Sequence, residues 1–273
     1  MHRITSHQGR DMIKNIRGVI FDLAGTLIDN GCHAPVHAMT VAFAKHGLLV
    51  SDETIRTDMG LPKRAHLKSI LAKPDIKGQW ESKFNNSPQE IDIDRLYQST
   101  NQKLKHIVCN YSKPTPYAVE LLHYLKDNGI RIGITTGYSR DIVNSLSSKI
   151  HKAGIIYNNL VCADEVKNPR PSAGMINKIL DDWEIYNFGR HQFIKIGDTV
   201  ADIQEANAAQ LTSCQVIDTC SDLGGIYKYN KGKKNREYIN SKKYYVMKKF
   251  ADNGAEFYCN NLEEVYKSLV GNR

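Results

Sequence analysis

Long apolar runs are missing from this chain of 273 residues: none approaches the roughly 18 consecutive apolar residues that a membrane-spanning helix needs. The first residues, MHRITSHQGRDMIKN, lack the apolar core of a signal peptide. Internal repeats and low-complexity segments are missing too. These absences predict a cytoplasmic protein without a membrane span, and about the first 15 residues are expected to form a polar, poorly ordered lead.

Cysteine pairs are also absent. The six cysteines are spread along the chain and none forms a CxxC pair, which argues against a zinc site. In the cytoplasm they are expected to be reduced thiols rather than disulfides.

Acidic residues are in short supply, since 29 Asp and Glu face 37 Lys and Arg, for a net charge of +8. A basic chain can attract an anionic substrate or a nucleic acid. Much of the excess lies in residues 228–249, where lysine and tyrosine interleave. This stretch carries no nucleic-acid-binding motif, so it is interpreted as a solvated loop and helix, and no nucleic-acid partner is expected.

Apolar runs that end in polar residues indicate four buried strands. They are VIFD (19–22), IRIGITTG (130–137), FIKIGDT (193–199) and SCQVIDT (213–219). Helical patterns lie between them at 115–129, 140–152 and 200–210. Strands that alternate with helices predict a parallel α/β sheet, in which ligands bind at the carboxyl ends of the strands. Asp22, Thr135–Thr136 and Asp198 are therefore expected to meet at one edge.

Residues 31–112 show little strand signal and are predicted to form a separate helical domain. Helical patterns cover 34–47, 51–60 and 91–111, with Ser51 as a helix N-cap. An insert between the first two strands of the sheet would form a cap that excludes water from the ligand edge and adds its own residues there. The predicted domains are an α/β core of residues 1–30 and 113–273 and a cap of residues 31–112.

Two of the strand ends carry carboxylates. Asp22 stands before a Gly25 turn, which alone is a common structural event. Asp198 and Asp202 lie four residues apart, near the start of a helix. Carboxylate oxygens are the ligands that Mg²⁺ prefers, although Asp202 could instead only cap or solvate that helix.

The other two signals suit a phosphate group. Residues 135–137, Thr-Thr-Gly, offer a hydroxyl and backbone N–H groups, although they would also suit an ordinary strand-to-helix turn. Arg170 stands between two prolines, where its planar donors could hold a phosphoryl oxygen. By itself it would be taken for a surface arginine, and only the four signals in this chain order point to one site.

Four residues match, in order, the four motifs of the haloacid dehalogenase superfamily of phosphotransfer enzymes: Asp22, Thr136, Arg170 and Asp198. The sequence therefore resembles that superfamily. This resemblance implies a Rossmann-like parallel-sheet core, attack of the first aspartate on phosphorus, an aspartyl-phosphate, and Mg²⁺ bound alongside. Most members carry a second Asp two residues after the nucleophile, where this chain has Ala24.

Residues 58–66, DMGLPKRAH, narrow the resemblance. Lys63 and His66 lie three residues apart, on one helix face if the segment is helical. MGLPK followed by His, together with Ala24, is similar to the phosphonoacetaldehyde hydrolases, or phosphonatases, which use a cap lysine as a Schiff base. The resemblance covers essentially residues 17–270, and the chain departs from it at Leu23, at Ala65 and in the segment RPSAGM (170–175).

The resemblance also implies a role for each site residue. Asp22 would be the nucleophile, Lys63 the Schiff base and His66 the proton carrier, with Tyr138 or a water as a rival for the last role. Mg²⁺ would be bound by Asp22, the backbone carbonyl of Ala24 and Asp198, with Asp202 in support. The expected substrate contacts are Cys32, Met59, Gly60, Thr135, Thr136, Gly137, Tyr138 and Arg170.

The expected reaction is therefore hydrolysis of the carbon–phosphorus bond of a small phosphonate to acetaldehyde and phosphate, in a homodimer joined through the caps. Two alternatives stay open. One is a phosphatase of the same superfamily acting on a small phosphate ester; it is disfavoured because Ala24 removes the usual leaving-group acid. The other is a non-catalytic binding protein on the same scaffold, which the presence of Asp22, Lys63 and Asp198 argues against.

Overall fold

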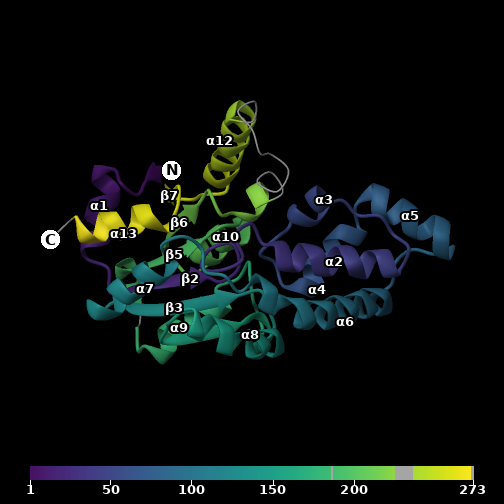
Figure 1. The fold of residues 1–273 in the computed structure, drawn as a ribbon, viewed down its shortest axis with the longest axis horizontal. Helices are drawn as coiled ribbons and strands as arrows, with labels where there is room; N and C mark the ends of the chain where they lie inside the picture. The colour runs from purple at the N-terminus through teal and green to yellow at the C-terminus, as the bar shows by residue number, and fades with distance from the viewer. Residues whose placement is uncertain (186, 225–235, 272–273) are drawn as a thin grey trace.

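The computed structural model describes residues 1–185, 187–224 and 236–271 (Figure 1). Its centre is a seven-stranded sheet of order β1-β7-β6-β5-β2-β3-β4, in which every neighbouring pair is parallel. The predicted parallel α/β architecture is confirmed. The strands are β1 (His2–Arg3), β2 (Gly18–Asp22), β3 (Arg131–Thr136), β4 (Asn159–Cys162), β5 (Phe193–Gly197), β6 (Thr212–Val216) and β7 (Phe257–Cys259).

The two central strands show why the sequence folds this way. Every residue of β2 and of β5 is buried, as expected for near-continuous apolar runs covered by helices on both faces of a parallel sheet. Strand β2 pairs with β3 on one side and β5 on the other. Asp22 lies opposite Thr135 in this register, so the carboxyl ends of these strands share one edge of the sheet.

Helices cover both faces of the sheet (Figure 1). The predicted helices at 115–129, 140–152 and 200–210 are confirmed, with the first and the third shorter than expected. The helices of this part are α1 (His7–Lys14), α7 (Ala118–Asp127), α8 (Arg140–Lys152), α9 (Gly174–Asp182), α10 (Val200–Ala208), α12 (Arg236–Asp252) and α13 (Leu262–Val270), with short 3-10 turns η2 (Ala163–Glu165) and η3 (Asn187–Gln192).

The N-terminal segment is ordered, so the expectation of a poorly ordered lead is wrong. Strand β1 pairs with β7 at the edge of the sheet, and the Ser6 side chain caps α1 by accepting the Gly9 N–H. Ile4 and Ile13 are buried in the same hydrophobic cluster as β2 and α13. These isoleucines are spaced among polar residues, so the segment looks polar in sequence although both side chains are buried.

The helical segment between β2 and β3 contains α2 (His33–Lys45), α3 (Asp52–Arg56), α4 (Lys63–Leu71), α5 (Pro74–Phe84), α6 (Glu90–Ile107) and the 3-10 turn η1 (Val108–Tyr111). It lies beyond one end of the sheet (Figure 1) and has a hydrophobic cluster of its own, which includes Phe43, Trp80 and Leu96. Ser51 caps α3 as expected, but this helix ends at Arg56 rather than at residue 60. The boundaries at 31 and 112 stay a prediction.

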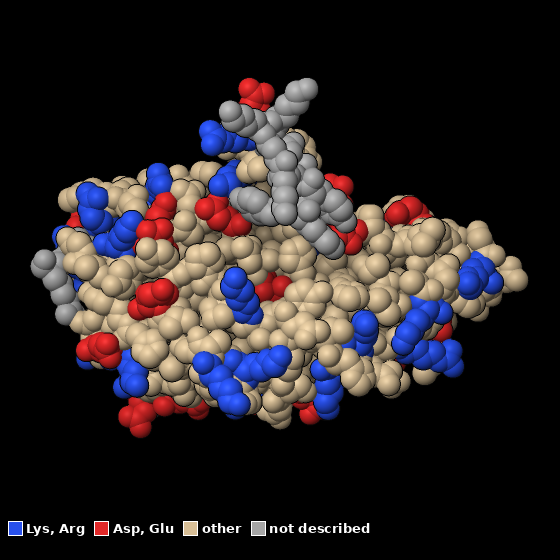
Figure 2. Space-filling model, viewed as in Figure 1, with Lys and Arg blue, Asp and Glu red and all other residues tan. Residues whose placement is uncertain are grey.

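Basic and acidic side chains are interspersed over the face shown in Figure 2. Of the basic stretch 228–249, residues 228–235 lie outside the described residues and the rest belongs to α12. Three lysines of this helix form ion pairs with Asp218, Asp222 and Asp252. Within the described ranges, none of the helices is both long and apolar enough to span a bilayer.

Candidate active site

A cavity of about 20 Å³ lies at the carboxyl ends of β2 and β3, with room for roughly one water molecule. Residues of the sheet side and of the helical segment both line it. They are Asp22, Ala24, Thr136, Gly137, Tyr138, Arg170 and Thr199 from the first and Cys32, Pro35, Met59, Gly60 and Lys63 from the second. Most of the residues that the sequence singles out therefore surround one small space.

Asp22 is the last residue of β2 and is buried. Its Oδ1 accepts a hydrogen bond from Arg170 Nη1 at 2.7 Å. Burial raises the pKa of Asp22 to about 6, and the charge of Asp202 acts in the same direction, while Arg170 opposes both. The carboxylate is thus held in a place where its negative charge is only partly compensated.

The turn after β2 brings Asp22 close to Asp198. Gly25 has φ 96°, and a Cβ there would collide with the Asp198 carboxylate, so this close approach requires glycine. Asp198 accepts hydrogen bonds from the Thr26 hydroxyl at 3.1 Å and from the Ser221 N–H at 3.0 Å. Burial, followed by the charge of Asp22, raises the pKa of Asp198 well above its usual range.

The predicted magnesium ligands are all oxygens: the carboxylates of Asp22 and Asp198 and the carbonyl of Ala24. The Cys32 thiol donates to that carbonyl at 2.9 Å and lies 3.6 Å from Asp198 Oδ2, so both oxygens lie near the same sulfur. Among the described residues, no group of three or more His, Cys, Asp or Glu side chains is arranged to hold a metal. The predicted magnesium site needs only two side-chain ligands, Asp22 and Asp198, because its third ligand is the backbone carbonyl of Ala24.

The charges around this place also suit a divalent cation. Four negative charges less three positive ones leave a surplus of one negative charge, which a cation would offset. Burial is the main cause of the raised pKa values of Asp22 and Asp198, and neighbouring carboxylates add to it. The oxygen ligands and the net negative charge therefore fit the ion. The buried charged side chains counted here are Asp22, Asp198, Asp202, Glu205, Arg170, Lys195 and Lys63.

Arg170 is buried, so the interpretation as a surface arginine is wrong. Its Nε donates to Glu205 Oε2 at 2.8 Å, and its Nη2 donates to the carbonyl and the hydroxyl of Thr135 at 2.9 and 2.7 Å. Thr135 itself is fully buried behind the cavity, whereas Thr136 lines it. The sequence could not show this because each acceptor comes from a different part of the chain.

The sequence allows two roles for Asp202, capping a helix and supporting the charged site, and the structure gives it contacts of both kinds. With Thr199 it forms the capping box of α10, and its Oδ1 lies 3.0 Å from Arg170 Nη2 and 3.1 Å from Lys195 Nζ. Burial alone would raise the pKa of Asp202, but the charges of Arg170 and Lys195 hold it below its usual range. Asp202 is therefore an anion paired with Arg170 and Lys195 rather than a residue of the cavity wall.

Lys63 is the first residue of α4, and its ammonium group lies 5.6 Å from the centre of the Tyr138 ring. Burial lowers the pKa of Lys63 to about 8, with a smaller contribution from Arg170 and opposition from Cys32 and Asp22. A substantial fraction of this amine is consequently neutral near pH 7 to 8, unlike that of a solvated lysine.

His66 shares the buried face of α4 with Lys63, so the predicted helix is observed. Its Nε2 lies 2.7 Å from the Ile55 carbonyl, which requires a proton on Nε2 and leaves Nδ1 as an acceptor. Burial and the charge of Lys63 lower the pKa of His66 to about 3, so the ring is neutral. It lies outside the cavity wall, and its role as a proton carrier stays a prediction.

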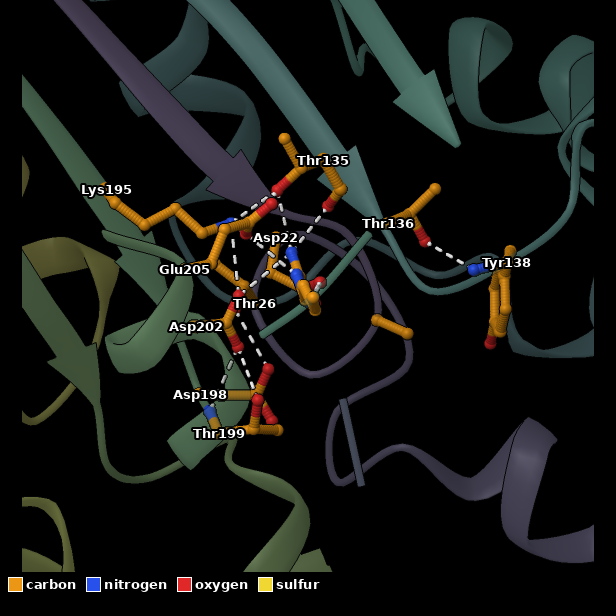
Figure 3. Close-up of polar contacts among 12 residues, drawn as sticks. Asp22, Thr26, Thr135, Thr136, Tyr138, Lys195, Asp198, Thr199, Asp202 and Glu205 are labelled. Carbon is orange, nitrogen blue, oxygen red and sulfur yellow. Dashed lines mark hydrogen bonds and ion pairs between the residues drawn. The ribbon is translucent and has the colours of Figure 1, made fainter. Parts of the chain in front are cut away.

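Tyr138 is the other candidate for moving a proton. It is buried in the cavity wall, and its N–H donates to the Thr136 hydroxyl at 3.2 Å (Figure 3). Its own hydroxyl has no hydrogen-bond partner among the described residues. Burial raises the pKa of this hydroxyl well above its usual range, so it is a neutral donor next to Lys63.

Two charged residues of the site escaped the sequence analysis: Lys195 on β5 and Glu205 on α10, both fully buried. A signal for each was present. Lys195 interrupts the apolar strand FIKIG, and Glu205 lies three residues after Asp202 on the same helix. A charge in a strand that is buried on both faces needs a partner, which could have prompted a search for an acidic residue.

The chain matches known proteins over most of its length. A family model described as haloacid dehalogenase-like hydrolase matches residues 19–216. A phosphonoacetaldehyde hydrolase of Bacillus cereus (strain AH187) is 33% identical over 242 residues, which are 89% of this chain and 90% of that protein. A bifunctional phosphonoacetaldehyde hydrolase/aminoethylphosphonate transaminase of Clostridioides difficile (strain 630) is 32% identical over 257 residues, which are 94% of this chain and 40% of that longer protein.

A solved structure agrees with these matches. The crystal structure of a phosphonoacetaldehyde hydrolase like protein from Oleispira antarctica superposes with a TM-score of 0.85 at 25% identity, over 94% of this chain and 95% of that one. The seven-stranded parallel sheet with its additional helices is thus the fold expected from the motifs. The chain belongs to the haloacid dehalogenase-like hydrolases, among which it is similar to the phosphonoacetaldehyde hydrolases.

Proposed function

We propose that this protein hydrolyses the carbon–phosphorus bond of phosphonoacetaldehyde, giving acetaldehyde and phosphate. The observation that carries the proposal is the position of Lys63, a buried amine with a pKa of about 8 that lines the same small cavity as Asp22. Ala24, in place of a second acid, supports it as well. The names of the similar proteins agree with this substrate.

An amine is needed because the carbanion left by direct displacement at phosphorus is too basic to depart. Lys63 Nζ attacks the aldehyde carbon and, with loss of water, forms a protonated imine. This imine accepts the electron pair of the breaking bond and becomes an enamine. Only the neutral amine can begin the sequence, and burial supplies it by lowering the pKa of Lys63.

Asp22 accepts the phosphoryl group. Its carboxylate attacks phosphorus, the carbon–phosphorus electron pair moves into the imine, and an aspartyl-phosphate forms while the enamine stays on Lys63. Protonation of the enamine carbon and hydrolysis of the resulting imine release acetaldehyde, and water hydrolyses the aspartyl-phosphate. Arg170, which donates to Asp22, would donate to a phosphoryl oxygen from the same position.

Asp22, the carbonyl of Ala24 and Asp198 would hold Mg²⁺, which when bound supplies positive charge beside the phosphoryl group. His66 and Tyr138 are the groups of this chain placed to handle protons near Lys63. Tyr138 lines the cavity and its hydroxyl can donate, whereas neutral His66 has no proton on Nδ1 and could only accept one, through a water.

The test is an assay of phosphonoacetaldehyde beside a panel of small phosphate esters with Mg²⁺ present. We expect kcat/KM for phosphonoacetaldehyde to exceed that of each ester by at least about a hundredfold, because only an aldehyde can form the imine. A better ester would establish the phosphatase alternative instead. Failure to turn over any of them, by a protein that still binds phosphate, would establish the binding-protein alternative.

Ala24→Asp is expected to lower kcat/KM for phosphonoacetaldehyde by about tenfold or more. The new carboxylate would crowd a cavity of about 20 Å³ and would pair with protonated Lys63. Each unit by which the pKa of Lys63 rises removes about nine-tenths of the neutral amine near pH 7. Steady-state kinetics check this, with Ala24→Asn as an uncharged control of the same size. A clear rise in kcat for the Asp variant would contradict the account.

The activity should depend on pH through Lys63. Because its pKa is about 8 and the neutral amine reacts, kcat/KM should rise about tenfold per pH unit below pH 8 and level off above it. Tyr138→Phe is the matched control, since the pKa of the Tyr138 hydroxyl lies well above this range. In this variant kcat/KM should rise over the same pH range as in the wild type. The assignment of the pH dependence to Lys63 would be wrong if the rise in kcat/KM occurred at a different pH in Tyr138→Phe. It would also be wrong if kcat/KM did not change from pH 6 to 9.

A further inference from the structure

Two buried charges near the cavity have no role in the proposed chemistry: Lys195 and Glu205, which lie beside Thr135 (Figure 3). Glu205 also accepts a hydrogen bond from Arg170 Nε. Lys195 Nζ donates to the Thr135 hydroxyl at 2.8 Å and lies 3.1 Å from Asp202 Oδ1 and 3.4 Å from Glu205 Oε2. Burying an ion pair is costly, and a hydrophobic pair would fill the same space at lower cost. Charges kept at this depth therefore call for an explanation beyond packing.

The contacts of Arg170 supply that explanation. A guanidinium has five N–H donors in one plane, so fixing two of its nitrogens fixes the direction of the third. Nε is held by Glu205 at 2.8 Å and Nη2 by Thr135 at 2.7 and 2.9 Å. Nη1 is the nitrogen that points to Asp22, and Asp22 is its only hydrogen-bond partner in the described part of the chain. Its second hydrogen is left for a ligand.

Glu205 itself is fixed from two sides. The same oxygen that accepts the Arg170 Nε–H also accepts the Thr135 hydroxyl at 3.0 Å, and Lys195 lies 3.4 Å away. Helix α10 carries Glu205 and Asp202, and strand β5 carries Lys195, so rigid elements hold the whole arrangement. A carboxylate held this firmly can orient a side chain as long as that of arginine.

We infer that Glu205 is a positioning residue, which holds the guanidinium plane of Arg170 so that Nη1 faces Asp22 and the phosphoryl group, and that Lys195 keeps Glu205 in place. This inference rests on the proposed function only in assigning a phosphoryl group to the cavity. Without the bond to Nε, Nη2 would still be held by Thr135 and Asp202, but the guanidinium could pivot about that nitrogen and shift Nη1 relative to Asp22. A misplacement of about 1 Å at a reacting group can cost a hundredfold in rate.

The competing explanation is that Glu205 only balances the charge of Lys195 in the core. The two explanations differ in what Glu205 does when Arg170 is absent. If Glu205 acts through Arg170, its removal costs nothing further in an Arg170→Ala protein. If it acts on the core alone, the two losses multiply, as they do for independent sites.

The experiment is a double-mutant cycle with Glu205→Ala, Arg170→Ala and the double variant, read out as kcat and KM for phosphonoacetaldehyde and as the Kd of inorganic phosphate with Mg²⁺ by calorimetry. We expect Glu205→Ala to lower kcat about a hundredfold with KM changed less than about threefold. Its Kd for phosphate should rise about tenfold. In the Arg170→Ala background, Glu205→Ala should change each quantity less than about twofold.

Two further variants sharpen the result. Glu205→Gln keeps an oxygen that can accept the Nε–H, so it should recover kcat to within about tenfold of the wild type, which loss of a charge balance would not allow. Asp29→Asn is the matched control, because Asp29 is a buried carboxylate bonded to backbone N–H groups of α2. If Asp29→Asn lowers kcat, the fold-loss in the double variant with Arg170→Ala should equal the product of the two single fold-losses.

Melting temperatures show which variants fold, and Arg170→Lys replaces Arg170→Ala in the cycle if the latter does not. Multiplying losses, a Glu205→Gln protein as poor as Glu205→Ala, or a fully active Glu205→Ala would each overturn the inference. Phosphate binding does not require turnover of a phosphonate. Suppose that the protein is inactive on phosphonoacetaldehyde, and that Glu205→Ala raises the Kd of phosphate in the wild type but not in the Arg170→Ala background. This result would refute the proposed function and retain the positioning role of Glu205.

Discussion

Asp22→Asn is expected to lower turnover of phosphonoacetaldehyde by at least about 10⁴-fold, because an amide cannot attack phosphorus. The fold should survive, since the amide oxygen of Asn can still accept the hydrogen bond from Arg170 Nη1. The native state also disfavours the ionised form of Asp22, whose pKa is raised to about 6. Above pH 6 that ionised form lowers the stability of the fold, so a neutral amide should leave the melting temperature unchanged or raise it.

Steady-state kinetics and a thermal melt at pH 7.5 together check this expectation. EDTA should silence the wild-type protein and added Mg²⁺ should restore it, while neither should affect the variant's residual rate. Asp202→Asn is an informative companion, because Asp202 is paired with Arg170 and its pKa is lowered, so this change should destabilise the fold. Activity of Asp22→Asn within tenfold of the wild type would remove Asp22 from the role of nucleophile.

Lys63→Arg is expected to lose all measurable phosphonatase activity. Arginine keeps the positive charge but offers no neutral amine near pH 7, so no imine can form. In the wild type, borohydride added with phosphonoacetaldehyde should reduce the imine to a stable secondary amine and inactivate the protein. Peptide mass mapping should place the added two-carbon or phosphonoethyl group on Lys63, and Lys63→Arg should show no adduct.

The controls for this trapping separate Lys63 from other amines. Borohydride alone and substrate alone should each leave activity intact. Lys195 is also buried, yet it lies behind Thr135 and outside the cavity wall, so it should not be labelled. An adduct elsewhere, or a Lys63→Arg protein that keeps full activity on a phosphate ester, would favour the phosphatase alternative.

The four strands expected from sequence are the longer ones, with every residue after the first buried, because a mostly apolar run is a strong local signal. The three that escaped detection, β1, β4 and β7, have two to four residues each, and such short runs resemble loops. Their pairing comes from tertiary contacts. Strand β1, for example, is held by β7 from the opposite end of the chain, which no local pattern can reveal.

The site divides in the same way. Asp22, Lys63 and Arg170 could be placed near one another from motifs, because Asp22 stands at a strand end, Lys63 in a recognisable cap segment and Arg170 between two prolines. The contacts that orient them could not. Glu205 looks like an ordinary helix acid and Lys195 like an isolated charge in a strand, until the fold brings both to Arg170. The position of His66 against the Ile55 carbonyl likewise depends on how α3 packs on α4.

The size of the cavity has a consequence for the pace of the reaction. A phosphonate is larger than the space of about 20 Å³ at this site, so the proposed reaction requires the loop of Met59 and Gly60, which packs on Thr199 and Gly137, to move aside. Each cycle of that reaction would then contain one opening and one closing movement. If this movement is slower than the bond-breaking steps, it would set a ceiling on turnover, and a viscous solvent would lower that ceiling.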